Sequence, residues 1–149
     1  MKILILTYAL FMTISLSLRA STPAQEKAFV DKYKTAFEAK DTATLVSFFY
    51  SEGADPAVLQ FTKTSLSALA GNKISKIELV NLTPQDAKKL AAPVDFPTGG
   101  KVCLKLKPTK KLVVTIENKD TSGRAASSFE NVVSEKDGKL VIPIPGPCK

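Results

Sequence analysis

Residues 29–56, with the sequence FVDKYKTAFEAKDTATLVSFFYSEGADP, decide the fold that we predict for this chain. They contain four of the eight Phe residues and two of the three Tyr residues, so most of the aromatic core is expected here. The pattern is typical of the end of one helix, a corner at Lys40-Asp41 and a second helix over residues 42–51 that Gly53 ends. Asp41 is expected to cap the second helix rather than to act in catalysis.

Two further helices are predicted on either side of the corner. Thr22 and Gln25 fit a capping box at the start of the first helix. Asp55 and Pro56 supply a cap and a first-turn proline for a third helix, which Gly71 ends. The first helix carries an apolar stripe that is most simply part of the core, while a ligand pocket built from it is the alternative. This stripe consists of Phe29, Tyr33, Ala36 and Phe37.

From Lys73 onward the apolar period changes from that of a helix to that of a strand. Thr83 can cap a short helix through Leu90, and residues 92–100 form an irregular loop. Strands are predicted around residues 77–79, 101–107, 112–116, 124–134 and 140–144, with turns at 108–111 and 118–123.

The last strand has two features of its own. Asp137-Gly138 predicts a hairpin before it. Pro143 and Pro145 cannot donate to a hydrogen-bond ladder, which places the strand at a sheet edge. We therefore predict an α+β fold, in which three N-terminal helices pack on an antiparallel sheet of four to five strands.

Residues 1–20 have the pattern of a secretory signal peptide, with Lys2 at the start, an apolar run over residues 3–18 and small Ala20 at the cleavage position. The alternative is an uncleaved membrane anchor, but the run is shorter than the ~20 residues that span a bilayer. Residues 21–149 are then expected to form a single secreted or periplasmic domain without membrane contact. The net charge falls from +7 to +5 on cleavage because the leader carries two cations and no anion.

The chain has two cysteines and no histidine. In an oxidising compartment Cys103 and Cys148 are expected to form a disulfide that ties the last residues to a central strand, and two free thiols are the alternative. The lack of His excludes Ser-His-Asp and Cys-His catalysis and the usual zinc sites. Any chemistry would have to come from carboxylates, Tyr, Lys, Ser or Thr, or from an oxygen-liganded metal, and we predict no metal site and no cofactor.

The start of the domain resembles a known family. Residues 33–41, YKTAFEAKD, followed by Phe48-Phe49 and Gly53-Ala54-Asp55, resemble the beginning of nuclear-transport-factor-2-like domains of the cystatin-like superfamily. Residues 50–56, YSEGADP, are also similar to a segment of small secreted bacterial proteins of unknown role. The resemblance implies a cone, in which a curved sheet wraps the first helix.

The resemblance leaves two functional expectations. Enzymes of this superfamily, such as ketosteroid isomerase, scytalone dehydratase and some polyketide cyclases, place Asp, Tyr or His in the cone. This chain has no His, and its inward strand positions are Val, Leu and Ile, which favours a non-enzymatic domain that binds a small apolar ligand or a partner protein. An isomerase-like or cyclase-like enzyme is the alternative, with Tyr33, Tyr50, Glu52 and Asp55 as acid and base candidates. An open cone would be lined by Tyr33, Phe37, Phe49, Val102, Val114 and Phe129.

A third expectation is a basic surface that binds a polyanion. The cluster lies on the predicted strand over residues 101–107 and the turn after it, and keeping an exposed sheet face soluble is its commoner use. No aromatic residue for base stacking lies among these lysines, so nucleic acid is not an expected partner. A dimer remains open. The cluster consists of Lys101, Lys105, Lys107, Lys110 and Lys111.

Overall fold

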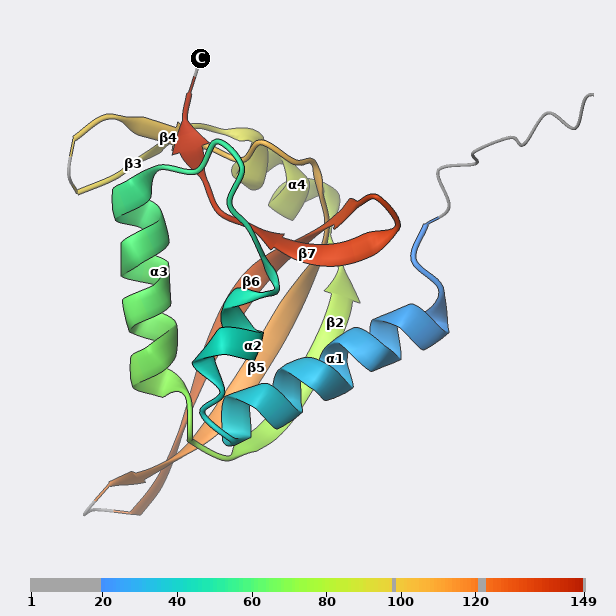
Figure 1. Cartoon of the computed structure of the whole chain (residues 1–149), viewed down its shortest axis with the longest axis vertical. Coiled ribbons are helices and arrows are strands. Elements are labelled where there is room, and N and C mark those ends of the chain that lie inside the picture. Colours follow the sequence, from blue (N-terminus) through green and yellow to red (C-terminus); the bar gives the residue numbers. More distant parts are fainter. Residues whose placement is uncertain (1–19, 98, 121–122, 149) are drawn as a thin grey trace, which may run out of the picture.

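The computed structural model describes residues 20–97, 99–120 and 123–148 and has the predicted α+β architecture (Figure 1). The helices are α1 (Pro23–Glu38), α2 (Thr42–Val46), α3 (Pro56–Leu69) and α4 (Pro84–Ala91). The long strands are β2 (Ile74–Asn81), β5 (Pro108–Asp120), β6 (Gly123–Lys136) and β7 (Lys139–Pro143). The short strands are β1 (Phe49–Tyr50), β3 (Val94–Asp95), β4 (Lys101–Cys103) and β8 (Gly146–Pro147).

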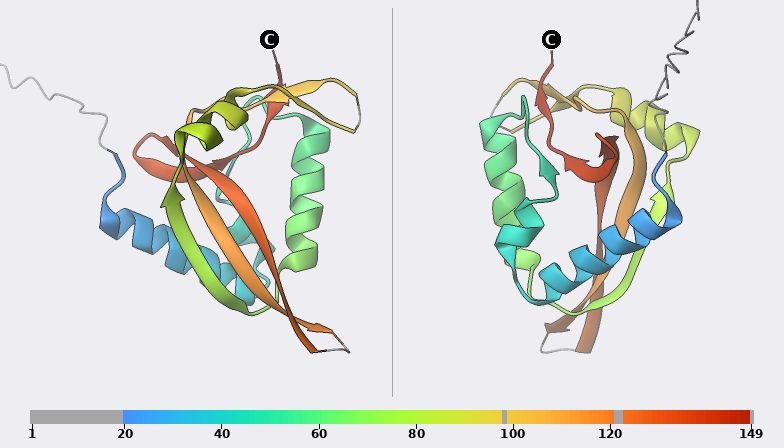
Figure 2. Two further views of the ribbon diagram at one scale, coloured as in Figure 1. Left: turned by 180° about the vertical axis from the view of Figure 1, so that it is seen from behind. Right: turned by 45° about the vertical axis from the view of Figure 1, so that its right-hand side comes forward.

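The strands form two sheets within the described residues. The larger has the order β1-β7-β6-β5-β2, and the smaller has the order β3-β4-β8. All pairings are antiparallel except that of β1 with β7, so the larger sheet is mixed rather than antiparallel as predicted. Figure 2 shows that the sheet is curved, that α1 lies across one of its faces, and that α3 stands beside β6.

The main core lies between α1 and the larger sheet. Tyr33 and Phe37 are 0% exposed, and they pack with the buried inward residues of β5 and β6. Phe37 contacts Phe129 with ring centroids 5.8 Å apart, and Phe29 meets Phe48 edge to face at 5.0 Å. The predicted apolar stripe of the first helix is therefore core.

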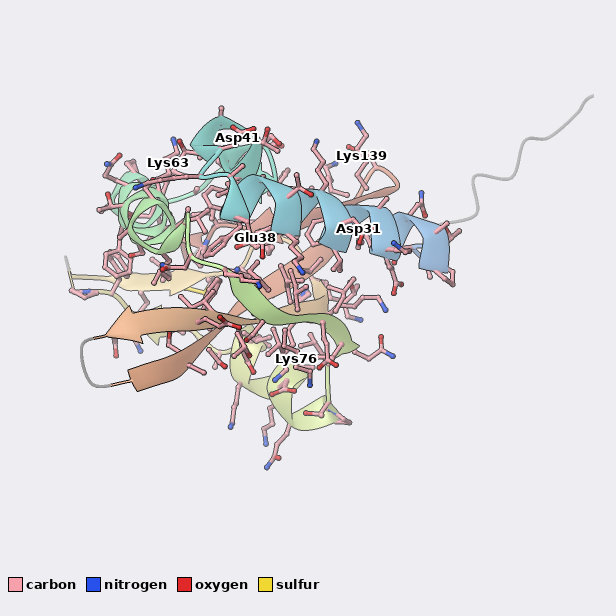
Figure 3. All side chains as sticks on the ribbon, turned by 90° about the horizontal axis from the view of Figure 1, so that it is seen from below. Asp31, Glu38, Asp41, Lys63, Lys76 and Lys139 are labelled. Atoms are coloured by element: carbon pink, nitrogen blue, oxygen red, sulfur yellow. A yellow bond between two sulfur atoms is a disulfide. The ribbon has the colours of Figure 1, made fainter. Side chains whose placement is uncertain are left out.

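The helix starts are as predicted because local capping decides them. Thr22 and Gln25 form the capping box of α1, and Thr83 with Asp86 forms that of α4. Asp55 Oδ1 accepts from the N–H groups at the start of α3. At the other end of α1, Glu38 points toward the start of β2 and accepts a hydrogen bond of 3.0 Å from the Ile74 N–H (Figure 3).

The second helix is shorter than the prediction of residues 42–51. It ends at Val46, and residues 49–50 form β1 instead. The Ile142 N–H donates to the Phe48 carbonyl at 2.7 Å, and the Ile144 N–H donates to the Tyr50 carbonyl at 2.9 Å. These long-range hydrogen bonds to β7 replace the helical ones. Gly53, with φ of 68°, therefore shapes a turn after β1 rather than a helix end.

The prediction that the last strand lies at an edge is also wrong, because β7 lies between β1 and β6. Pro143 is tolerated there because β6 no longer runs beside it. Pairing of β7 with β6 extends from Lys139 only to Val141, and the neighbours Ile142 and Ile144 donate to the opposite side. The missing N–H of Pro143 thus faces the side where the ladder has already ended.

The predicted strand over residues 101–107 ends at Cys103 and belongs to the smaller sheet. The disulfide therefore attaches to this small sheet and not to a central strand as predicted. Residues 108–111, predicted as a turn, are the start of β5. The loop predicted over residues 92–100 includes the short strand β3, which pairs with β4.

Candidate functional site

The six residues predicted to line a cone do not surround one cavity. Tyr33, Phe37 and Val114 fill the main core and are fully buried. Val102 belongs to a separate buried cluster with Val58 and Ile144. Phe49 and Phe129 are half-buried, and both line a smaller hollow next to α3. The space inside the predicted cone is therefore occupied by side chains.

A cleft with a volume of about 350 Å³ lies instead between α3 and the larger sheet. The β3–β4 segment forms a further wall, and the end of β7 also lines the cleft. Its apolar floor includes the buried cluster of Val58, Val102 and Ile144. The size and lining are typical of sites that take small apolar groups.

A second hollow of about 180 Å³ adjoins the first. It is lined by Phe49 and Leu66 among others, and it shares Thr62, Glu130 and Asn131 with the cleft. The two hollows therefore meet between α3 and β6. We call the two together the α3–β6 groove.

Large apolar side chains lie exposed at the rim of the groove. Phe61 of α3 is 64% exposed and Val94 of β3 is 58% exposed, and both line the cleft. Phe61 contacts Phe96 edge to face, with ring centroids 6.1 Å apart. Because exposed aromatic and aliphatic groups of this size gain free energy when covered, the rim favours an apolar guest.

The charges near the groove are mostly paired with each other. Glu130 lies 3.2 Å from Lys111, which is also 3.7 Å from Asp86 of α4. The hydrogen bond with Glu130 raises the pKa of the Lys111 ammonium, and that with Thr83 lowers the pKa of the Asp86 carboxyl. These pairs at the surface contribute little stability.

The wall formed by β3 and β4 is tied down by the disulfide. Cys103 of β4 is bonded to Cys148, as predicted. The Cys148 N–H donates to the Lys101 carbonyl at 3.1 Å, and Lys105 Nζ donates to the Pro147 carbonyl. The bridge therefore holds β8 against β4 and fixes one side of the groove.

The predicted acid and base residues lie outside the groove. The Tyr50 hydroxyl donates to Glu52 Oε2 at 2.7 Å on the surface, which raises the pKa of the Tyr50 phenol. Asp55 is engaged as the cap of α3. The Tyr33 hydroxyl accepts from Asn131 Nδ2 at 3.2 Å, and burial raises the pKa of this phenol. The four candidates therefore do not form one catalytic set.

The predicted basic face is not one face. Lys101 lies on β4, and Lys105 and Lys107 follow β4 outside any strand. Lys110 and Lys111 lie on β5, where Lys110 Nζ is 3.1 Å from Glu26 of α1. Among the residues that the structure describes, no group of three acidic, His or Cys side chains is placed to hold a metal ion. In the same ranges no helix is long and apolar enough to span a bilayer.

Comparison of the chain with protein-family models, with curated proteins and with solved structures finds no match. The resemblance of residues 33–41 to nuclear-transport-factor-2-like domains therefore stays a prediction.

The exposed residues at the rim of the groove were not predicted from the sequence. Phe61 lies in the third helix beside, and not within, the apolar stripe that includes Leu59 and Leu66. A large aromatic residue off the buried face is a sign of an exposed binding surface. Val94 and Phe96 lie in the loop predicted over residues 92–100, and loops of this length in a compact domain are often functional.

Proposed function

We propose that this protein is a non-enzymatic binding domain that takes an apolar guest in the α3–β6 groove. The observation that carries the proposal is the cleft of about 350 Å³ with a buried apolar floor and with Phe61 and Val94 exposed at its rim. A monomeric domain rarely exposes such groups beside a hollow unless something covers them.

The chemistry of the groove favours binding over catalysis. Its polar lining includes Thr62, Lys89, Glu130 and Asn131. Of these, Thr62 donates to the Val58 carbonyl, Asn131 donates to Tyr33, and Glu130 is paired with Lys111. Such groups can orient a guest, but the candidate acids and bases lie elsewhere.

We place this activity outside the cytoplasm. A disulfide persists in an oxidising compartment, and the Cys103–Cys148 bridge is compatible with a secreted or periplasmic protein. The signal-peptide pattern of residues 1–20 supports the same location.

The test uses an anilinonaphthalene sulfonate probe and a panel of medium-chain alcohols and fatty acids, with fluorescence and thermal shift as readouts. Thr62→Trp places a large ring where the two hollows meet and should weaken binding at least tenfold. Gln60→Trp adds the same ring to an exposed position of α3 that is not among the groove residues, and should leave affinity unchanged.

Two outcomes would overturn the proposal. The first is that no apolar probe binds the wild-type protein saturably. The second is that Thr62→Trp and Gln60→Trp bind the probes equally well, because the bound site would then lie away from the groove.

A further inference from the structure

One edge of β6 lacks a neighbouring strand where it passes the groove. β5 pairs with β6 along nearly its whole length, but β7 pairs with it only over Ser134–Lys136. Over Phe129–Val133 no described strand lies on the second side of β6. Figure 2 shows β6 as the strand of this part of the sheet that lies closest to α3.

The register identifies which main-chain groups face that open side. In an antiparallel ladder alternate residues direct both N–H and C=O to the same neighbour. The two-residue turn at Asp137-Gly138 makes Lys136 and Ser134 the residues that hydrogen-bond to β7. By the same alternation, Val132 and Glu130 present their N–H and C=O groups to the open side.

These two main-chain positions lie in the groove. Glu130 and Val132 both line the larger hollow, and Glu130 lines the smaller one as well. Within the described residues, none of the main-chain hydrogen bonds outside regular pairing involves either residue. The open edge and the apolar walls are thus parts of one surface.

The open edge of β6 arises from the course of β7. After Val141 this strand turns away from β6 and pairs with β1, and Pro143 has no N–H with which to continue the ladder. The space that a longer β7 would fill is therefore bordered by Pro143 and Ile144, which line the cleft.

We propose that the groove receives an extended peptide segment of a partner protein, which adds as a strand to the open edge of β6. The segment would span about five residues, to match the length of the edge. Because strand side chains alternate, its apolar residues would enter the groove from one face of the added strand. This inference rests on the proposed function and names the class of guest.

The main-chain groups explain why a peptide suits the groove better than a small apolar molecule. A purely apolar guest over Glu130 and Val132 would remove water from their N–H and C=O groups and leave them without partners. A peptide brings its own main-chain donors and acceptors at the spacing of a strand. The N–H and C=O groups of Glu130 and Val132 would then be buried with hydrogen-bond partners.

The test uses a panel of octapeptides in which Thr alternates with Val, Leu or Phe, measured by isothermal titration calorimetry and by amide hydrogen exchange. At least one peptide should bind and should slow exchange at Glu130 and Val132. The same peptide N-methylated at the alternate residues that face β6 should bind at least tenfold more weakly, because it lacks the donors.

The matched protein variant is Val132→Pro, which removes an N–H on the open side and leaves the ladder with β5 intact. It should weaken peptide binding at least tenfold, with circular dichroism checking that the variant is folded. If apolar probes bind but no peptide does, or if N-methylation has no effect, strand addition is wrong while the apolar groove stands. If neither class of guest binds, both proposals fail.

Discussion

The bridge between Cys103 and Cys148 closes a loop with a sequence separation of 45 residues. We expect the double variant C103S/C148S to be less stable because its unfolded chain is no longer constrained. For a loop of this length the chain-entropy relation gives about 4 kcal/mol at 25 °C. A small domain has a total stability of about 5–15 kcal/mol, so this loss is a large fraction.

The assay is urea unfolding followed by circular dichroism, with the oxidised wild type, the reduced wild type and C103S/C148S compared. The reduced wild type and the double variant should lose similar amounts of unfolding free energy relative to the oxidised wild type, since both lack the bridge. The double variant should also bind apolar probes more weakly, because β8 and Cys148 no longer hold β4 at the groove.

A loss below about 1 kcal/mol would refute the loop-closure explanation. A decrease in the urea dependence of unfolding would have a different meaning. It would show that the β3-β4-β8 sheet opens separately from the main core, so that the two-state comparison no longer applies.

Three further changes test the packing directly. Gly146→Ala should destabilise by at least about 2 kcal/mol, because its Cβ would lie 1.8 Å from the Gly53 carbonyl oxygen; an unchanged urea midpoint would contradict this close approach. Phe37→Ala should lower the free energy of unfolding in urea by about 3–5 kcal/mol, because Phe37 lies in the core. Phe61→Ala should change it by no more than about 0.5 kcal/mol but should weaken probe binding, because Phe61 lies at the rim. Equal losses of stability would show that the assignment of core and rim is wrong. Burial holds the pKa of the Tyr33 phenol above its ordinary 10.0, so the stability that this residue contributes is complete below pH 10 and is lost as the pH rises further. The melting temperature of Tyr33→Phe should therefore fall less at high pH than that of the wild type. If the two melting temperatures fall in parallel, the Tyr33 phenol is not the cause.

The parts of the fold that local chemistry decides could be predicted from the sequence. The caps at Thr22, Asp55 and Thr83 act within one helical turn, so no distant residue can override them. The alternation over residues 112–116 also fixes which side chains of β5 enter the core.

Residues 46–50, with the sequence VSFFY, could not be assigned from local pattern, because a short apolar run fits a helix or a strand. The decision comes from Ile142 and Ile144, almost a hundred positions away, whose N–H groups bond to this segment. The same kind of distant contact places β7 inside the sheet.

The candidate site was harder to predict than the fold. Sequence identifies apolar residues that face inward, but it does not show whether they fill the space between layers. Here Tyr33 and Phe37 fill it, and the hollow lies beside α3 because β7 turns away from β6. The predicted basic face depended on a strand that continues past Cys103, and that strand ends there.

Residues 139–148 complete three separate parts of the molecule, because they pair with β6 and β1, pair with β4 and supply one half of the disulfide. A nascent chain therefore cannot finish any of these parts until residues 139–148 have been synthesised. The pairings of β7 with β1 and of β8 with β4 join residues far apart in sequence, and such contacts slow folding. Until then part of the apolar surface stays uncovered, and such transiently exposed surface makes a partly folded chain prone to aggregate.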